Sequence, residues 1–294
     1  MTEERSPESL VAELVWLLDP QSAGVDAFTG HRQPGGVGRV YGGQAIAQAL
    51  VAAERTVADD REAHSLHAYF LRGGSEDHAI DLRVERDFDG SSFSNRRVIA
   101  SQQGTPILNL TASFHRPEPG VEHQDQMPDM PGPDGLQSEA SIRAEHLDLA
   151  PKAIHELMLR PRPLEVRPVN KAHWFGVERS EGKLAAWFRT VAPLPDDPRV
   201  HRAVLAYASD HGLMLASFAP HQLNWLQGTV NAASLDHAVW FHGAFRADEW
   251  LLYVMDSPWS GRARGFNRGQ IYTQDGRLVA EVAQEALLRL RKPA

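Results

Sequence analysis

The feature that most constrains this chain is an internal repeat. Residues 94–104 read SNRRVIASQQG, and residues 266–276 read FNRGQIYTQDG. A repeat at this separation is far beyond the period of solenoid proteins. The sequence therefore predicts two copies of one fold. The matched positions are Asn95/Asn267, Arg96/Arg268, Ile99/Ile271, Gln102/Gln274 and Gly104/Gly276, followed by apolar runs at 106–110 and 278–282.

The landmarks that precede these blocks keep the same order in both copies. YGGQ at 41–44 corresponds to YASD at 207–210, and HSLHA at 64–68 corresponds to SLDHA at 234–238. Alanines and apolar residues at helical spacing predict a buried central helix in each copy, over 42–56 and over 200–219. Runs typical of antiparallel strands follow, with hairpin turns at Asp-Gly and Gln-Gly pairs. The predicted strands are 64–71, 79–88, 91–102 and 106–116, then 234–241, 250–256, 262–273 and 277–289.

The segment between the copies has a different composition. It contains PEPG at 117–120, MPDMPGPDG at 127–135 and RPRP at 160–163. Proline and charge at this density predict a linker, with spaced apolar residues favouring a short helix within 138–159. The expected domains are therefore 1–118, a linker over 119–163, and 164–294.

Composition excludes several classes of protein. The formal net charge is −8 and there is no run of Lys and Arg, so nucleic acid is not expected as a partner. The chain has no cysteine, which removes thiolate chemistry and Cys-based metal sites. The amino terminus has no basic region, and the longest span without charged residues, 211–235, is interrupted by Pro220 and Gly228. Together with a carboxyl terminus that is not of the SKL type, this predicts a cytoplasmic protein without a membrane span.

Several motifs resemble one family over nearly the whole chain, acyl-CoA thioesterase II of the TesB type. They are VYGGQ (40–44), HAYFLRGG (67–74), RPLEVRPV (162–169), SLDHAVWFH (234–242), EWLLY (249–253), ARGFNRG (263–269) and YTQDGRLVAEVAQE (272–285). The resemblance implies an α+β double hotdog, two antiparallel sheets each wrapped around a central helix, which agrees with the repeat. It also implies an acyl-CoA substrate, no cofactor and a homo-oligomer.

The resemblance further implies a catalytic trio. In the family an Asp, a Thr or Ser hydroxyl and a Gln orient a water for direct attack on the thioester carbonyl, and here they fall on Asp210, Ser234 and Gln284. Ser234 stands where the best-known members have threonine, so the hydroxyl is kept and the methyl is lost. Such a water needs one group to accept its proton and others to orient it. Asp210 is expected near a helix amino terminus, whose N–H groups also polarise a thioester oxygen.

The repeat match pairs this trio with Gln44, His64 and Ala112, so only the second copy carries it. Gly43, Gln44, His64 and Arg72 are the candidate substrate-binding residues. Gly42 and Gly43 would let the backbone approach a ligand or a strand closely. His64 and His67 are expected on opposite faces of a strand, which argues against a metal site. Arg72, Lys171, Arg262 and Arg264 are either contacts for coenzyme A phosphates or solvated surface charges.

Other interpretations remain open at this level. Taken singly, Asp210 is typical of a helix N-cap, and Ser234 and Gln284 are typical polar strand residues. A hotdog hydratase would need Asp and His around an Asn-Pro pair; Asp26 and His31 have the spacing but not the pair. A non-catalytic acyl-CoA binding protein would keep the pocket and lose the trio. No G-x-S-x-G elbow or complete dinucleotide motif is present.

Overall fold

The computed structural model describes residues 5–170, 183–223 and 230–291. The first half of the chain forms α1 (Pro7–Leu17), β1 (Gln21–Gly24), β2 (Ala27–Gly30), α2 (Gly42–Glu54), β3 (Glu62–Phe70), β4 (Ile80–Asp89), β5 (Phe93–Gln102) and β6 (Thr105–His115). The second half forms β7 (Leu164–Pro168), β8 (Leu184–Thr190), α6 (Pro198–Ser209), α7 (Leu215–Phe218), η3 (Ala219–His221), β9 (Val230–Ser234), β10 (Asp236–Phe241), β11 (Leu251–Gly261), β12 (Arg264–Thr273) and β13 (Leu278–Leu290).

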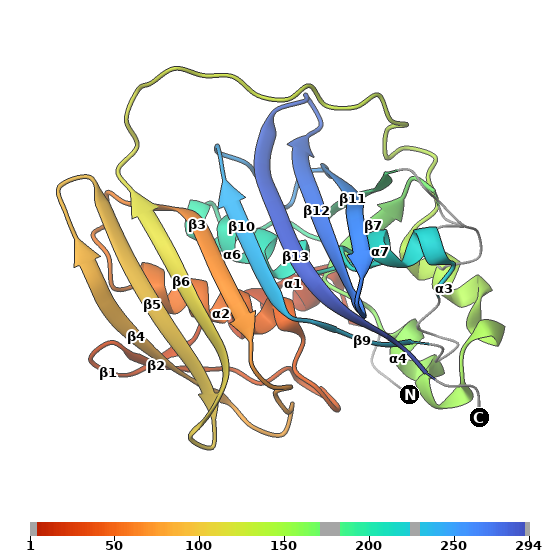
Figure 1. The fold of residues 1–294 in the computed structure, drawn as a ribbon, viewed down its shortest axis with the longest axis horizontal. Helices are drawn as coiled ribbons and strands as arrows, with labels where there is room; N and C mark the ends of the chain where they lie inside the picture. The colour runs from red at the N-terminus through yellow and green to blue at the C-terminus, as the bar shows by residue number, and fades with distance from the viewer. Residues whose placement is uncertain (1–4, 171–182, 224–229, 292–294) are drawn as a thin grey trace.

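The two halves share one continuous antiparallel sheet. Among the described residues its order is β1-β2-β4-β5-β6-β3-β10-β13-β12-β11-β8-β7, with β9 paired to β13 off this path. Outward from the β3–β10 junction, each half runs through its strands in the same sequence, β6-β5-β4 on one side and β13-β12-β11 on the other (Figure 1). Two hotdog units thus join edge to edge, so the two predicted sheets form a single one.

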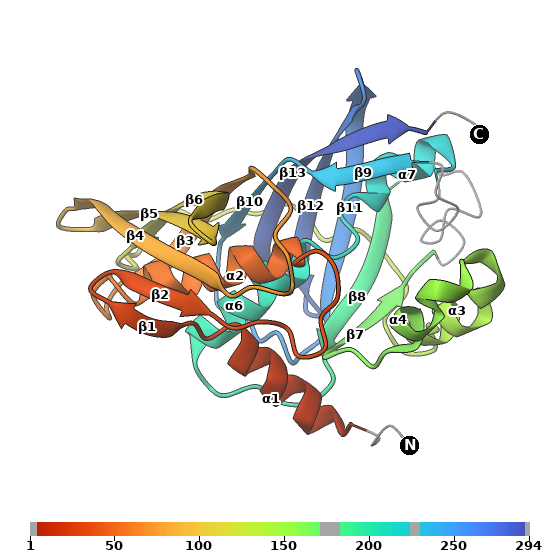
Figure 2. The ribbon, with the colours of Figure 1, turned by 90° about the horizontal axis from the view of Figure 1, so that it is seen from below.

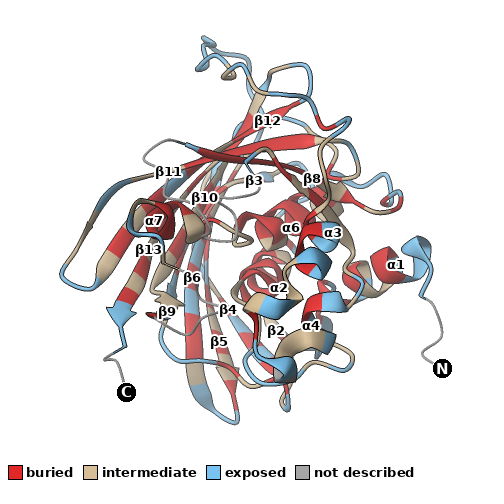
Figure 3. Ribbon diagram, turned by 90° about the vertical axis from the view of Figure 1, so that its right-hand side faces the viewer, coloured by how far each residue is buried: buried red, intermediate tan, exposed pale blue. Residues whose placement is uncertain are grey.

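The two central helices fill the concave side of this sheet. Figure 2 shows α2 and α6 together beneath the strands, with α1 further out. Helix α2 is buried on nearly every side: Ala45, Ile46, Ala49 and Leu50 are each at most 4% exposed. Figure 3 shows the same burial along both helices. Small side chains at these positions let the sheet curve closely around the helices, as the alanine-rich sequence predicts.

The helices α2 and α6 pack antiparallel and carry a buried ion pair. The Arg202 Nε lies 3.0 Å from a Glu54 carboxylate oxygen, and both side chains are at most 9% exposed. Burial raises the pKa of Glu54 to about 7, and the attraction of Arg202 opposes that rise. The charged pair therefore depends on both partners being present.

The strand register corrects the repeat alignment by one residue. The β5–β6 hairpin turns on Gln103 and Gly104, both with positive φ. The β12–β13 hairpin has one residue more, because Thr273 N–H donates to Arg277 O and Gly276 takes φ +90°. Counted from these loops, Arg96 corresponds to Asn267 rather than to Arg268. A slip of one residue exchanges the two faces of a strand.

Side-chain positions support this corrected register. Arg96 and Asn267 both face the helices, with 1% and 0% exposure. Arg97 and Arg268 both point outward and form ion pairs with the neighbouring strand, to Asp87 and Asp256 respectively.

Two predicted elements are interrupted in the second half. The helix expected over 200–219 ends at Ser209, because the chain turns through Gly212 with φ +80°, and a short α7 follows. The strand expected over 234–241 is broken at Leu235 into β9 and β10, which both pair with β13. Asp236 bridges the break by accepting a hydrogen bond of 2.6 Å from Glu285 N–H. Asp210 and Ser234 lie at these two interruptions, and Gln284 lies within the continuous strand β13.

The connection between the halves runs across the edge of the sheet without regular structure before it turns helical (Figure 1). The single short helix predicted within 138–159 is instead two, with two 3₁₀ turns between them. They are α3 (Glu139–Glu145), η1 (Leu147–Leu149), η2 (Lys152–Ile154) and α4 (His155–Leu159). The domain boundaries at 118 and 163 remain predictions.

We expect Arg202→Met to lower the free energy of unfolding by about 3–5 kcal/mol at pH 8, because it leaves a buried carboxylate unpaired. The loss should be smaller at pH 5.5. The folded-state pKa of Glu54, about 7, lies above the ordinary value of 4.5, so its contribution to stability falls as the pH rises through this window. Without Arg202 that pKa rises further and the fall extends above pH 7.

Urea unfolding at the two pH values measures this difference. Arg199→Met is the matched control, since Arg199 lies on the same helix but pairs with the exposed Asp59. An equal loss for Arg202→Met at both pH values would contradict the assignment.

Candidate active site

Asp210 lies where the two central helices meet. It is the C-cap of α6, so the interpretation of Asp210 as a helix N-cap is wrong. Its carboxylate nevertheless reaches a helix amino terminus, that of α2 in the other half: Gly43 N–H donates to Asp210 Oδ2 at 3.1 Å. A helix amino terminus is positively polarised and favours an anion.

The glycines at this helix start make the contact possible. A Cβ on Gly42 would lie 2.7 Å from Asp210 Oδ2, and a Cβ on Gly43 would lie 2.3 Å from the carbonyl oxygen of Tyr207. The close approach of Gly42 and Gly43 is therefore to the last turn of the helix α6 and not, as the sequence predicts, to a strand.

Buried tyrosines hold that last turn in place. Tyr41 Oη donates to the carbonyl of Tyr207 at 2.9 Å, and Tyr253 Oη donates to the carbonyl of Ser209 at 2.8 Å. Carbonyls in the last turn of a helix lack intrahelical partners, so these bonds satisfy them. Burial, with Asp210 adding to it, raises the pKa of Tyr41 and Tyr253 well above the ordinary value of 10. Both hydroxyls therefore stay protonated as donors.

Asp210, Ser234 and Gln284 come together at this point from α6, β9 and β13. Gln284 Nε2 donates to Asp210 Oδ1 at 2.7 Å and to Ser234 Oγ at 2.9 Å. Ser234 Oγ also lies 3.5 Å from Asp210 Oδ1, as donor. Gln284 is 1% exposed, whereas Asp210 and Ser234 are partly accessible. The cluster is a carboxylate, a hydroxyl and an amide around one point open to solvent.

The first half has no equivalent cluster. Counted from the hairpin loops, Gln284 corresponds to Ala112, as the sequence predicts. Ser234 corresponds to Ala63 rather than His64, since Ala63 pairs with β6 as Ser234 pairs with β13. Gln44 lies in the first turn of α2, so it is not equivalent to Asp210 at the end of α6. The residues that correspond to Ser234 and Gln284, Ala63 and Ala112, have no polar side-chain group, so they cannot activate a water.

Two cavities meet at Asp210. One, of about 430 Å³, extends along the start of α2 and includes Gly42, Ser234 and the side chains of Arg39 and Arg72. The other, of about 330 Å³, extends towards α4 and α7, and its apolar lining includes Leu157, Met158 and Phe218. The second cavity is also lined by Glu139, Arg143, Arg162 and His211. The carboxylate therefore lies at the junction of the two cavities, and the apolar residues of the second come from α4 and α7.

The other candidate binding residues are placed differently. Gln44 is buried and donates to the backbone of His31. Arg72 lines the basic cavity and donates to Pro106 O. His64 lies on the outer face of the sheet, 2.8 Å from Ser113 Oγ, and does not reach the cluster. Arg39 was not predicted; it stands just before VYGGQ and has no distinctive signal of its own.

A β-bulge explains the position of His64. The register between β3 and β6 shifts between Ala63 and Ser65, which turns the His64 side chain outward. His67 also faces outward, edge-on to Trp240, so the prediction that the two histidines face opposite sides is wrong.

The remaining predicted residues lie apart from the cluster. Arg264 pairs with Glu285, and Arg262 lies in the turn between β11 and β12 with positive φ. Lys171 lies outside the described residues. Asp26 pairs with Arg86 at the β1–β2 turn, and His31 stacks on Trp16, so the pair required by a hydratase is not assembled.

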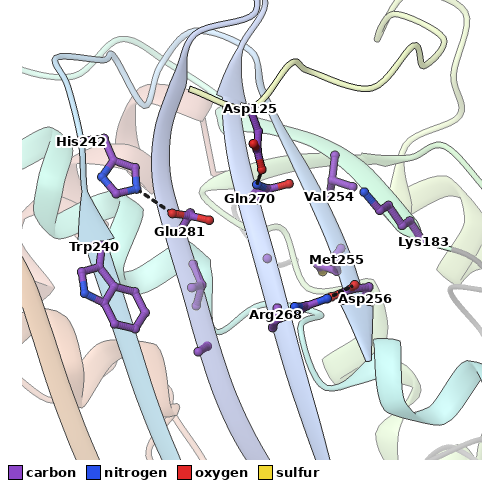
Figure 4. Close-up of a pocket in the computed structure, with 13 residues that line it drawn as sticks. Asp125, Lys183, Trp240, His242, Val254, Met255, Asp256, Arg268, Gln270 and Glu281 are labelled. Carbon is purple, nitrogen blue, oxygen red and sulfur yellow. Dashed lines mark hydrogen bonds and ion pairs between the residues drawn. The ribbon is translucent and has the colours of Figure 1, made fainter. Parts of the chain in front are cut away.

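A larger groove of about 570 Å³ lies on the outer face of the sheet (Figure 4). Six of its polar residues are bound to one another in pairs: His242 to Glu281, Arg268 to Asp256, and Gln270 to Asp125 of the connection. The sheet separates it from the trio. The groove is larger than either cavity at Asp210, but the candidate active site is at Asp210 because the catalytic side chains converge there.

Comparison with known proteins agrees with this geometry. Family models described as acyl-CoA thioesterase and acyl-CoA thioesterase N-terminal domain match residues 155–287 and 31–115. Human acyl-coenzyme A thioesterase 8 is 37% identical, with 96% of this chain and 90% of the human protein covered. The chain belongs to the acyl-CoA thioesterase II family.

Solved structures show the same family and fold. Acyl-CoA thioesterase II TesB2 from Mycobacterium marinum is 36% identical, with a TM-score of 0.78 over 96% of this chain and 99% of the other. A hot dog fold protein from Alicyclobacillus acidocaldarius is 18% identical with a TM-score of 0.74, over 95% and 98% of the two chains, and shows the fold alone. The predicted family, double hotdog and enzyme class, a thioester hydrolase, are confirmed. In the described parts of this thioesterase, no helix has the length and apolarity needed to span a bilayer.

We expect Gly43→Ala to destabilise this thioesterase by about 1–3 kcal/mol, because the new methyl group would meet the Tyr207 carbonyl. Within a helix, a change from Gly to Ala normally raises the free energy of unfolding by up to about 1 kcal/mol. A decrease for Gly43→Ala would therefore indicate that the methyl group meets the Tyr207 carbonyl. Urea unfolding measures it. Gly120→Ala, where a Cβ meets nothing within 4 Å, is the control. A gain in stability for Gly43→Ala would mean that the helices can part without cost.

Proposed function

We propose that this enzyme hydrolyses acyl-CoA to a free fatty acid and coenzyme A through a water activated by Asp210. The observation that carries the proposal is the convergence of Asp210, Ser234 and Gln284 at the junction of two cavities. Family membership and the names of the relatives support the substrate class. A preference for medium to long chains is part of the proposal.

The chemistry follows from the groups present. Asp210 accepts a proton from the water while the water oxygen bonds to the thioester carbonyl carbon. Ser234 offers a hydroxyl to that water, and Gln284 fixes the positions of Asp210 and Ser234 around it by donating hydrogen bonds from its amide N–H₂ group to them. The carbon–sulfur bond then breaks, and the proton held by Asp210 passes to the departing thiolate. Water is consumed, and one acid and one thiol are formed.

The carbonyl oxygen becomes negatively charged in the transition state, and the start of α2 is suited to receive it. Gly43 N–H is bound to Asp210, whereas Gly42 faces the basic cavity. Free N–H groups at a helix start are effective donors to such an oxygen, since they are fixed before the reaction begins. We assign the Gly42 backbone to this position.

The two cavities separate the two ends of the substrate. Arg39 and Arg72 give the first cavity the charge needed for the phosphates of coenzyme A. The apolar residues of α4 and α7 give the second the character needed for an acyl chain. The thioester would then lie between the cavities, beside Asp210. The enzyme is further proposed to act as a homo-oligomer in the cytoplasm, without a cofactor.

Release of free thiol from acyl-CoA esters of C4 to C18 tests the proposal. We expect Asp210→Asn to lower kcat by about 100-fold or more while substrate still binds, because the amide cannot accept the proton. Asp125→Asn is the matched control: it makes the same change in the outer-face groove and should leave kcat unaltered.

Two outcomes would overturn the proposal. Full activity of Asp210→Asn would exclude Asp210 as the base. Binding of acyl-CoA by the unmodified enzyme without thiol release at any chain length would favour the non-catalytic binding protein instead.

A further inference from the structure

The trio is supported by a histidine that takes no part in the proposed proton transfer. His237 lies on β10, in the SLDHA motif, and is 0% exposed. Its ring stands between two polar side chains: Nε2 lies 2.8 Å from Ser209 Oγ on α6, and Nδ1 lies 3.3 Å from Gln284 Nε2 on β13. Asp210 is the charged group that acts on it, and β3 offers only Ala68 opposite.

The direction of these hydrogen bonds is determined at one end. Ser209 Oγ donates its single proton to the carbonyl of Ala206 at 2.9 Å, so towards His237 it can only accept. His237 must therefore carry a proton on Nε2. Burial lowers the pKa of His237, which keeps the ring neutral and Nδ1 free of a proton.

A bare Nδ1 fixes the orientation of Gln284. It accepts from the amide N–H₂ group and would repel the amide oxygen. The Gln284 amide nitrogen then also faces Asp210 Oδ1 and Ser234 Oγ. If the amide turned over, its oxygen would meet the Asp210 carboxylate, and Asp210 and Ser234 would lose the donor that they share.

We propose that His237, held as its Nε2–H tautomer by Ser209, is a positioning residue that sets the amide orientation of Gln284. The expected effect on kcat rests on the proposed function. The expected tautomer of His237 and the orientation of the Gln284 amide rest on the hydrogen-bond chain. The chain runs from Ala206 O through Ser209 and His237 to Gln284 and Asp210. Its members come from α6, β10 and β13, so it also ties both central strands of the second half to the end of the helix.

The kinetic test compares His237→Phe with His237→Asn. Phenylalanine keeps a planar ring but offers no acceptor, so kcat should fall by about 10- to 100-fold with KM changed little. Asparagine can place its amide oxygen where Nδ1 stands and should recover most of the lost kcat. Ser209→Ala removes the acceptor that holds the proton on Nε2 and leaves the ring unchanged. It should lower kcat by a smaller factor than His237→Phe.

His201→Phe is the matched control. His201 is also a buried histidine, 3% exposed with a lowered pKa, and accepts from Ala247 N–H on Nδ1. It has no contact with the trio, so its replacement should affect stability and leave kcat per folded molecule unchanged. If His237→Phe lowers kcat no more than His201→Phe, or if His237→Asn is as poor as His237→Phe, the positioning role is wrong.

A spectroscopic reading separates this inference from the proposed function. In ¹⁵N-histidine-labelled protein, the His237 ring, identified by its loss in His237→Asn, should show the Nε2–H neutral form at pH 7. A proton on Nδ1, or a charged ring, would overturn the inference even if thiol release follows the Asp210 prediction. Absence of thiol release from the unmodified enzyme would instead overturn the proposed function and leave the tautomer testable.

Discussion

The contact on which the site depends is the close approach of the end of α6 to the start of α2. Asp210 follows the last turn of one helix and binds the first turn of the other, through Gly43 N–H. Neither hotdog unit could assemble this contact alone, since each contributes one helix. Any side chain larger than hydrogen at Gly42 or Gly43 would occupy the space that the carboxylate and the Tyr207 carbonyl use. The catalytic arrangement is thus a property of the packed pair.

Antiparallel packing of two related helices creates a second junction, which holds a buried ion pair instead of a catalytic cluster. There the end of α2 meets the first half of α6, and Glu54 pairs with Arg202. Both junctions place a carboxylate beside the opposite helix. At the Glu54 junction the Arg202 guanidinium neutralises the carboxylate, and the pair is closed to solvent. At the Asp210 junction, the Gly43 backbone N–H and the Gln284 amide bind the carboxylate, and a cavity opens in front of it. A carboxylate bound by N–H groups remains able to accept a proton from a water, whereas one held by a buried arginine is occupied.

The sequence predicts the architecture well and the site partly. The duplicated blocks, the alanine-rich segment at 42–56 and the Asp-Gly and Gln-Gly turns predict two copies of a fold with a buried helix and antiparallel strands, and the family resemblance implies that this fold is the double hotdog. The residue correspondence fails by one position because a single additional residue in the β12–β13 loop, and the interruptions at Ala63–Ser65 and Leu235, cannot be seen in a self-comparison. For this reason the prediction that His64 binds substrate fails: a bulge turns its side chain to the outer face of the sheet. The trio itself was reached through family resemblance, and its contact with α2 required the tertiary structure, since 167 positions separate Gly43 from Asp210.

The amide of Gln284 shows that the site is organised in advance of substrate. Its oxygen, Oε1, is buried and has no hydrogen-bond partner among the described residues, while the two hydrogens on its nitrogen are shared among three acceptors, with His237 the most distant at 3.3 Å. A rotation of the amide would turn this oxygen towards the Asp210 carboxylate and His237 Nδ1, which would repel it. The amide nitrogen therefore stays facing the base. Donors fixed before the reaction need no reorganisation when the water attacks.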